Sequence, residues 1–196
     1  MFKVHCNFIG DFKLGDNINY NLKSLSKLYE YYRGATSIDR GYLQKPIILI
    51  LVSVTEAVLH DFHGRIRKFT WEGIKNMPAS VMTYIQELTR IDKFEQYIAS
   101  ARKHDFFDAK DTAFYDDMEE LRRLRNRIHI QNEKGDFEPD EYNAFTVRRK
   151  VQAERVLEMT LKTMARKYAR GPEHKYVADF ELPWNEHFPI RVIHDG

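Results

Sequence analysis

The stretch Pro46-Ile-Ile-Leu-Ile-Leu-Val-Ser-Val-Thr-Glu-Ala-Val-Leu59 decides the fold of this chain, because it is apolar on nearly every side. A helix of that kind is buried by neighbours on several sides. Its β-branched residues also fit a buried strand, but residues 42–62 contain no helix breaker other than Pro46, which fits a first turn or a kink. We therefore expect a central helix over about residues 40–63, capped by Asp39.

Helical periodicity continues on both sides of this central helix. The preceding helix is expected to follow a cap at Asp16-Asn17 and to end at Gly34. After the central helix, glycine and proline in residues 64–80 predict a loop or a short helix, and residues 132–139 predict a turn. Further helices are expected over residues 80–90, 92–103, 111–131 and 140–170.

The two ends of the chain lack this helical pattern. Phe2, Val4 and Cys6 alternate with polar residues, which is typical of a short strand or an extended arm. The tail from Glu173 is aromatic and non-helical, and we expect it to pack across the domain or against a partner subunit. The sequence therefore predicts one all-α domain over residues 1–196, a bundle of about five to six helices with an N-terminal arm (1–16) and an irregular C-terminal tail (173–196).

Composition sets broad limits on function. Charged residues make up 31% and hydrophobic residues 43% of the 196 residues, which is ordinary for a soluble globular domain. The net charge of +2 means that any basic surface must be local. A single cysteine, Cys6, fits a reducing compartment, and the N-terminus lacks the pattern of a signal peptide. Because the longest apolar run is too short to span a bilayer, we expect a cytoplasmic protein with no membrane partner.

A second stretch, Leu121-Arg-Arg-Leu-Arg-Asn-Arg-Ile-His129, carries the candidate chemistry. Its apolar residues repeat at helical spacing and predict a buried stripe: Leu121, Leu124 and Ile128. The flank beside that stripe gathers polar side chains: Arg122, Arg125, Asn126 and His129. Arg123 and Arg127 are expected on the opposite, solvent side. Such a cluster can hold a phosphodiester and move a proton, although a run of charges on a helix also fits a solvated face with pairs inside the helix.

This stretch resembles the motif of the HEPN superfamily, an arginine followed by four to six residues and a histidine on a late helix of an all-helical domain. His129 would be the motif histidine, and Arg125-Asn126 looks like the usual arginine–asparagine pair. Only three residues separate Arg125 from His129, whereas Arg123 and Arg122 have spacings of five and six. Because Arg123 is expected to face away from His129, the candidates for the motif arginine are Arg122 and Arg125.

The long apolar helix adds to the resemblance, because a Ser-x-x-Glu inside it looks like the second helix of HEPN domains. Glu56 in that helix must be paired or protonated, since an unpaired buried charge is costly. Arg125 or Arg122 is its natural partner. Glu56 either fixes the arginine and tunes His129 or forms a purely structural ion pair.

The resemblance implies a metal-independent endoribonuclease without a cofactor, in which a 2′-hydroxyl attacks the adjacent phosphate. His129 would transfer the proton, Arg122 and Arg125 would hold the phosphate, and Asn126 would orient one of these groups. HEPN nucleases usually assemble the site across a homodimer, and many act as toxins or defence effectors with an antitoxin or regulatory protein. The alternative is a non-catalytic HEPN-like module that binds a partner protein, a nucleotide or RNA. Some HEPN toxins are modified on a tyrosine two residues after the histidine, but Gln131 occupies that position here.

Other candidate sites are weaker. His60 and His63 lack a third metal ligand, and we expect both at the surface near the end of a helix. Glycines are too scattered for a phosphate-binding loop. Basic and aromatic residues mix in the stretch 65–71, where a loop packed on the core is favoured over an RNA-binding surface.

Overall fold

The computed structural model describes residues 1–68, 74–87, 91–129 and 140–189. Within these residues it contains seven α-helices, two 3₁₀ turns and one two-stranded sheet, which confirms the predicted all-α class. The elements, in chain order, are β1 (Phe2–Val4), α1 (Phe12–Gly34), α2 (Ser37–Lys68), α3 (Ala79–Glu87), α4 (Phe94–Lys103), α5 (Phe114–Arg125), η1 (Asn126–Ile128), α6 (Glu141–Ala144), α7 (Val147–Lys167), η2 (Pro172–His174) and β2 (Phe180–Leu182).

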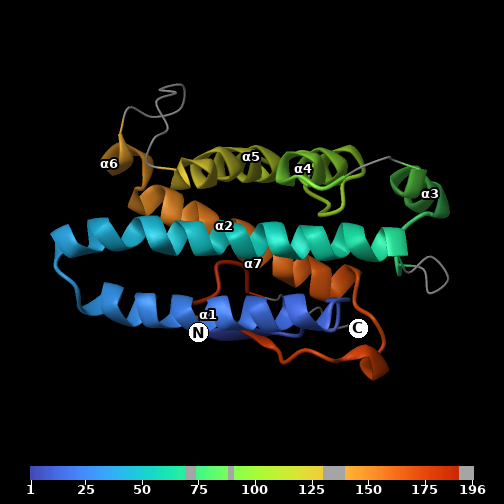
Figure 1. Cartoon of the computed structure of the whole chain (residues 1–196), viewed down its shortest axis with the longest axis horizontal. Helices are drawn as coiled ribbons and strands as arrows, with labels where there is room; N and C mark the ends of the chain where they lie inside the picture. Colours follow the sequence, from blue (N-terminus) through green and yellow to red (C-terminus); the bar gives the residue numbers. More distant parts are fainter. Residues whose placement is uncertain (69–73, 88–90, 130–139, 190–196) are drawn as a thin grey trace, which may run out of the picture.

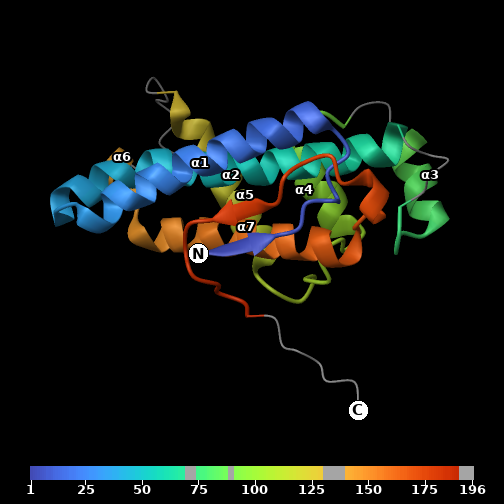
Figure 2. The ribbon, with the colours of Figure 1, turned by 90° about the horizontal axis from the view of Figure 1, so that it is seen from below.

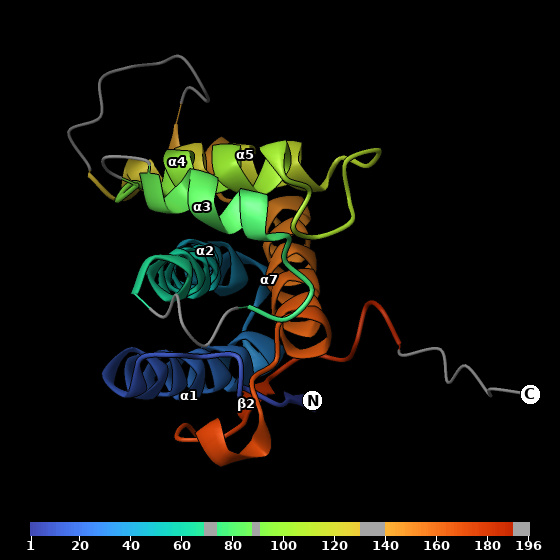
Figure 3. The same ribbon diagram turned by 90° about the vertical axis from the view of Figure 1, so that its right-hand side faces the viewer.

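The apolar helix α2 lies at the centre of the molecule, as predicted. Figure 1 shows α1 along one side of α2 and the pair α4 and α5 along the other. The view along α2 in Figure 3 shows α7 against a third side. Because three sides are covered within one protomer, Ile47, Leu51 and Leu59 are completely buried without a partner subunit.

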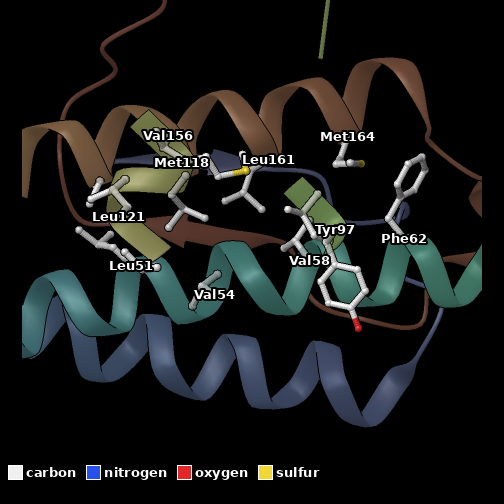
Figure 4. Close-up of a cluster of buried hydrophobic side chains, with 14 of the residues drawn as sticks. Leu51, Val54, Val58, Phe62, Tyr97, Met118, Leu121, Val156, Leu161 and Met164 are labelled. Carbon is white, nitrogen blue, oxygen red and sulfur yellow. The ribbon is translucent and has the colours of Figure 1, made fainter. Parts of the chain in front are cut away.

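The core fills the space where α2, α7, α4 and α5 meet (Figure 4). Most of its side chains come from positions three or four apart on a helix, so each long helix presents one apolar stripe to the others. The labelled members, all buried, are Leu51, Val54, Val58 and Phe62 of α2, Tyr97 of α4, Met118 and Leu121 of α5, and Val156, Leu161 and Met164 of α7.

The two ends of the chain meet in the small sheet. β1 and β2 are antiparallel, and Phe2 pairs with Leu182 while Val4 pairs with Phe180. Figure 2 shows the two strands side by side over α7 and α1. The predicted extended arm thus contains a strand, and the described part of the C-terminal tail, up to residue 189, packs across its own domain.

Several predicted helix boundaries are wrong at the N-terminal side. Helix α1 begins at Phe12, not after Asp16-Asn17, because the carboxylate of Asp11 caps it by accepting from the Leu14 amide at 2.9 Å. Helix α2 begins at Ser37 and continues to Lys68, through part of the predicted loop. Pro46 lies inside α2 and not in its first turn.

The C-terminal helices also differ from the prediction. Helix α5 ends at Arg125, short of residue 131. The helix predicted over residues 140–170 is two helices, because Asp140 caps only the single turn α6 and Thr146 caps α7, accepting from the Arg149 amide at 3.3 Å. Gln131, the predicted turn at residues 132–139 and the last residues of the helix predicted over 80–90 lie outside the described residues.

One helix in the described part of the chain, α2, is long and apolar enough to cross a membrane by length and composition. Half of its most apolar window is buried inside the structure. The core helix of a soluble protein has the same properties, so this finding is weak evidence for a membrane span.

Candidate functional site

The end of α5 differs from the continuous helix that the motif predicts. After Arg125 the chain tightens into the 3₁₀ turn η1, and His129 follows in an extended conformation. A 3₁₀ turn advances about 120° per residue instead of about 100°, so the expected faces rotate by about 60° over three residues. As a result Ile128 is 54% exposed and Arg127 is buried, the reverse of the predicted pattern.

Arg122 is held by two carboxylates. Its Nε and Nη2 atoms donate to Glu119 of the same helix at 2.9 and 2.6 Å, and its Nη1 lies 3.5 Å from a Glu95 oxygen of α4. The hydrogen bond to Glu119 raises the pKa of Arg122, and the same bond lowers the pKa of the Glu119 carboxyl. The guanidinium is therefore neutralised within its own protomer.

Arg125 is paired with the carboxylate of the central helix. Its Nη2 lies 2.6 Å from Oε2 of Glu56, and the two side chains are 37% and 22% exposed. The expectation that Glu56 needs an arginine partner is thus confirmed, and the partner is Arg125 and not Arg122. The pair joins α5 to α2 at the point where α5 ends.

The remaining motif residues are exposed. The side chains of His129 and Asn126 point to solvent, and no described residue forms a hydrogen bond with either side chain. Arg123 is 60% exposed as predicted and lies 3.5 Å from Glu119. The structure therefore brings Arg125 to Glu56, but it does not join His129 or Asn126 to either arginine by a hydrogen bond.

The polar face of α2 continues one turn beyond Glu56. His60 is exposed, and its Nδ1 lies 2.8 Å from the hydroxyl of Tyr97 of α4. Burial raises the pKa of Tyr97, and the nearby carboxylates of Asp92 and Glu56 raise it further. Sequence reasoning missed Tyr97 and also the arginine clamps Glu95 and Glu119. The only sequence signal for this part of the site was the four-residue spacing of Glu56 and His60, which places both side chains on one face of a helix.

Two other expectations are corrected. His63 is buried, not at the surface, because α2 continues past it and α4 covers that side. Arg65 is also buried in α2, where it donates to the Phe8 carbonyl at 2.6 Å, so the basic stretch begins as a helix and not as a loop. No group of metal-ligating side chains occurs among the residues that the structure describes.

The chemistry of this site follows from its charges. Three carboxylates (Glu56, Glu95 and Glu119) face the arginines of α5, so an incoming phosphate must compete with them for the guanidinium groups. His129 adds an exposed imidazole to the end of this stretch, a group that can donate or accept a hydrogen bond.

Comparison with known proteins identifies no relative. No family model matches the chain, and neither the curated proteins nor the solved structures contain a significant match.

Proposed function

We propose that this protein is a metal-independent endoribonuclease of the HEPN type that cleaves RNA by attack of a 2′-hydroxyl on the adjacent phosphate. The observation that carries the proposal is the arrangement at the end of α5. An exposed imidazole, His129, lies four residues after Arg125, the arginine that the central helix holds through Glu56. A cytoplasmic toxin or defence effector, controlled by an antitoxin or regulatory protein, is the biological role that fits this activity.

In the proposed reaction His129 takes the proton of the 2′-hydroxyl. The 2′-oxygen then forms a bond to phosphorus, and the bond to the 5′-oxygen breaks. The leaving 5′-oxygen receives a proton from the motif imidazole of the second protomer, so the products are a 2′,3′-cyclic phosphate and a 5′-hydroxyl. A guanidinium can hold the non-bridging oxygens through two parallel hydrogen bonds and stabilise their negative charge in the transition state.

The two candidate arginines differ in their freedom to bind a phosphate. Arg122 is 18% exposed and lies against two carboxylates, whereas Arg125 is 37% exposed and has one carboxylate partner, Glu56. A phosphate therefore displaces fewer contacts at Arg125. We assign Arg125 to phosphate binding and Arg122 to positioning of the helix, with Asn126 as a further polar contact.

A homodimer is part of the proposal. One protomer supplies a single His129, and two motif ends that face each other would supply both a base and an acid. The apolar residues 47–59 and the aromatic tail suggest a second reason for a dimer, more apolar surface than a small bundle can cover, but α1, α4, α5 and α7 already cover α2. Light scattering should show a dimer at tens of micromolar, and a monomer at that concentration would contradict a composite site.

Alanine variants test the assignment of each residue. His129→Ala should lower the rate of RNA cleavage by about 10²–10⁴, because a proton-transfer group typically contributes that factor. Arg125→Ala should reduce cleavage more than Arg122→Ala does. Arg123→Ala is the matched control on the same helix, and it should leave the rate unchanged because its side chain is exposed. Far-ultraviolet circular dichroism checks that each variant is folded.

Two outcomes would reject this mechanism: cleavage that survives His129→Ala, and cleavage that stops when EDTA is added.

The alternative function is a non-catalytic helical module. It is favoured by the pairing of both Arg122 and Arg125 with carboxylates, which leaves neither guanidinium without a partner. If the protein is such a module, the wild type cleaves no RNA, and the alanine substitutions at His129, Arg122 and Arg125 change only the affinity for its partner.

A further inference from the structure

Exposed hydrophobic side chains gather at one end of the bundle. This end is formed by the C-terminus of α1, the N-terminus of α2, η1, α6 and the N-terminus of α7, which lie together on the left of Figure 1. It carries half of the large hydrophobic residues that are exposed in the described part of the chain. They are Tyr31, Ile38, Tyr42, Ile128, Tyr142 and Val147. Ile128 directly precedes His129 of the candidate site.

The three tyrosines lie on neighbouring elements at this end of the bundle. Tyr31 and Tyr42 line the same hollow where α1 turns into α2. One turn along α2 from Tyr42, the ammonium group of Lys45 pairs with Glu141 of α6 and lies 5.4 Å from the centre of the Phe145 ring. These contacts hold α6 beside α2, and Tyr142 of α6 is the most exposed of the three tyrosines.

Positive charges without carboxylate partners accompany the tyrosines. Arg33 donates to the Pro183 carbonyl at 2.6 Å, and Arg40 donates to the carbonyls of Tyr32 and Arg33 at 3.0 Å. Among the described residues no carboxylate pairs with Arg33 or Arg40, so both charges remain available to an anion. The two carboxylates at the hollow are engaged locally: Glu30 pairs with Lys27, and Asp39 accepts from the Thr36 hydroxyl.

Exposed aromatic rings, with cations at the same end of the domain, are features that bind single-stranded nucleic acid. Every base has a flat aromatic face, so stacking on tyrosine is tolerant of sequence, and the arginines attract the backbone. Helix α2 links this end of the bundle to the proposed reaction centre. Fourteen residues of α2 separate Tyr42 from Glu56, which is about 21 Å at about 1.5 Å per residue.

We propose that Tyr31, Tyr42 and Tyr142 form a stacking platform for unpaired bases of single-stranded RNA, which leads the strand to His129. That the bound RNA is then cleaved rests on the proposed function, whereas the binding of RNA to the platform does not. The platform selects RNA by its unpaired bases and its backbone charge, and a fully paired duplex presents no free base face to it.

Binding can be measured apart from cleavage. The full chain with His129→Ala is titrated into a fluorescein-labelled single-stranded RNA of about 12 nucleotides, within the usual site size of about 4–16. Fluorescence anisotropy then gives the Kd. We expect Tyr31→Ala, Tyr42→Ala and Tyr142→Ala each to weaken binding about five-fold or more, because each removes a stacked base. The corresponding Tyr→Phe variants should stay within about two-fold, since they keep the ring.

Tyr20→Ala is the matched control, because Tyr20 also lies on α1 and is 73% exposed, against 71% for Tyr31. It should leave the Kd unchanged. An abasic oligonucleotide of the same length should bind more weakly than the RNA and should respond equally little to all the tyrosine variants.

The outcomes separate the two proposals. If the RNA does not bind, or if the three Tyr→Ala variants bind as tightly as the Tyr20→Ala control, the platform is wrong. If those variants instead change the oligomeric state in light scattering while RNA affinity is unchanged, this end is a protein interface and the platform is again wrong. Tyrosine-dependent binding without any cleavage by the wild type would support the platform and overturn the nuclease. Cleavage of RNA whose binding does not depend on the tyrosines would support the nuclease and overturn the platform.

Discussion

At the scale of single residues, His63 is a buried imidazole with one unused nitrogen. Its Nδ1 donates to the Leu59 carbonyl at 2.8 Å, and its Nε2 has no partner among the described residues. Burial lowers the pKa of His63 to about 4, and the nearby imidazoles of His60 and His104 oppose its protonation further. The protein therefore holds His63 in its neutral form.

This burial predicts a pH dependence of stability. The unfolded chain binds a proton at His63 near its ordinary pKa of 6.5, whereas the folded chain does so only near pH 4. Between these values the unfolded state binds more protons, so the free energy of unfolding falls as the pH drops from about 6.5 to 4, by at most about 3 kcal/mol. Urea denaturation across this range measures it. His63→Phe should remove this contribution to the change of unfolding free energy with pH. If that pH dependence is the same in the variant as in the wild type, His63 is not its source.

Part of the candidate site could be predicted from single residues. A carboxylate inside an apolar helix needs a cation, and that physical requirement predicted that Glu56 pairs with Arg125 or Arg122, of which Arg125 is the partner. The exposure of Ile128 and the burial of Arg127 could not be predicted, because they depend on where α5 changes to a 3₁₀ turn. The clamp on Arg122 by Glu95 was equally hidden, since it depends on how α4 packs beside α5.

At the scale of secondary-structure elements, α2 provides the support for the rest of the molecule. Leu51 is completely buried where α2 faces α5 and α7. Leu51→Ala should reduce the free energy of unfolding by about 2–5 kcal/mol, because it leaves a cavity that its neighbours fill only in part. Ser53→Ala, two residues further on and exposed, is the control and should change it by less than about 0.5 kcal/mol. Equal effects of the two variants in urea unfolding would contradict the central position of α2.

Most helices were predictable as elements, whereas their ends were not. The apolar run of α2 could be identified because burial on several sides leaves a continuous pattern in the sequence. The caps depend on one side chain each, and Asp11 and Thr146 had competitors nearby in Asp16 and Asp140. Local hydrogen bonds in the folded chain decide between such competitors. The N-terminal arm is therefore shorter than predicted, and the last predicted helix is divided into α6 and α7.

At the scale of the whole molecule, the C-terminal tail closes the fold through a buried carboxylate. Glu158 of α7 is fully buried and accepts hydrogen bonds from the Trp184 indole at 3.1 Å and from the amides of His187 and Phe188 at 3.0 and 2.9 Å. Burial alone would raise the pKa of Glu158, but these donors and Lys162 lower it. The four-residue spacing of Lys150, Glu154, Glu158 and Lys162 looks like a solvated face, so the sequence could not reveal this anchor.

Glu158→Gln tests whether the anchor holds the tail. The glutamine keeps the size of the side chain, but its amide group turns one acceptor into a donor that faces other donors. We expect the free energy of unfolding to fall by about 1–3 kcal/mol, because buried amides of the tail lose their acceptor. We also expect faster proteolysis of the tail after Leu182 under native conditions.

Glu186→Gln, which changes an exposed carboxylate paired with the same Lys162, is the control and should have little effect on either measurement. A tail as protected in Glu158→Gln as in the wild type would mean that the β1–β2 pairing holds the tail without the carboxylate.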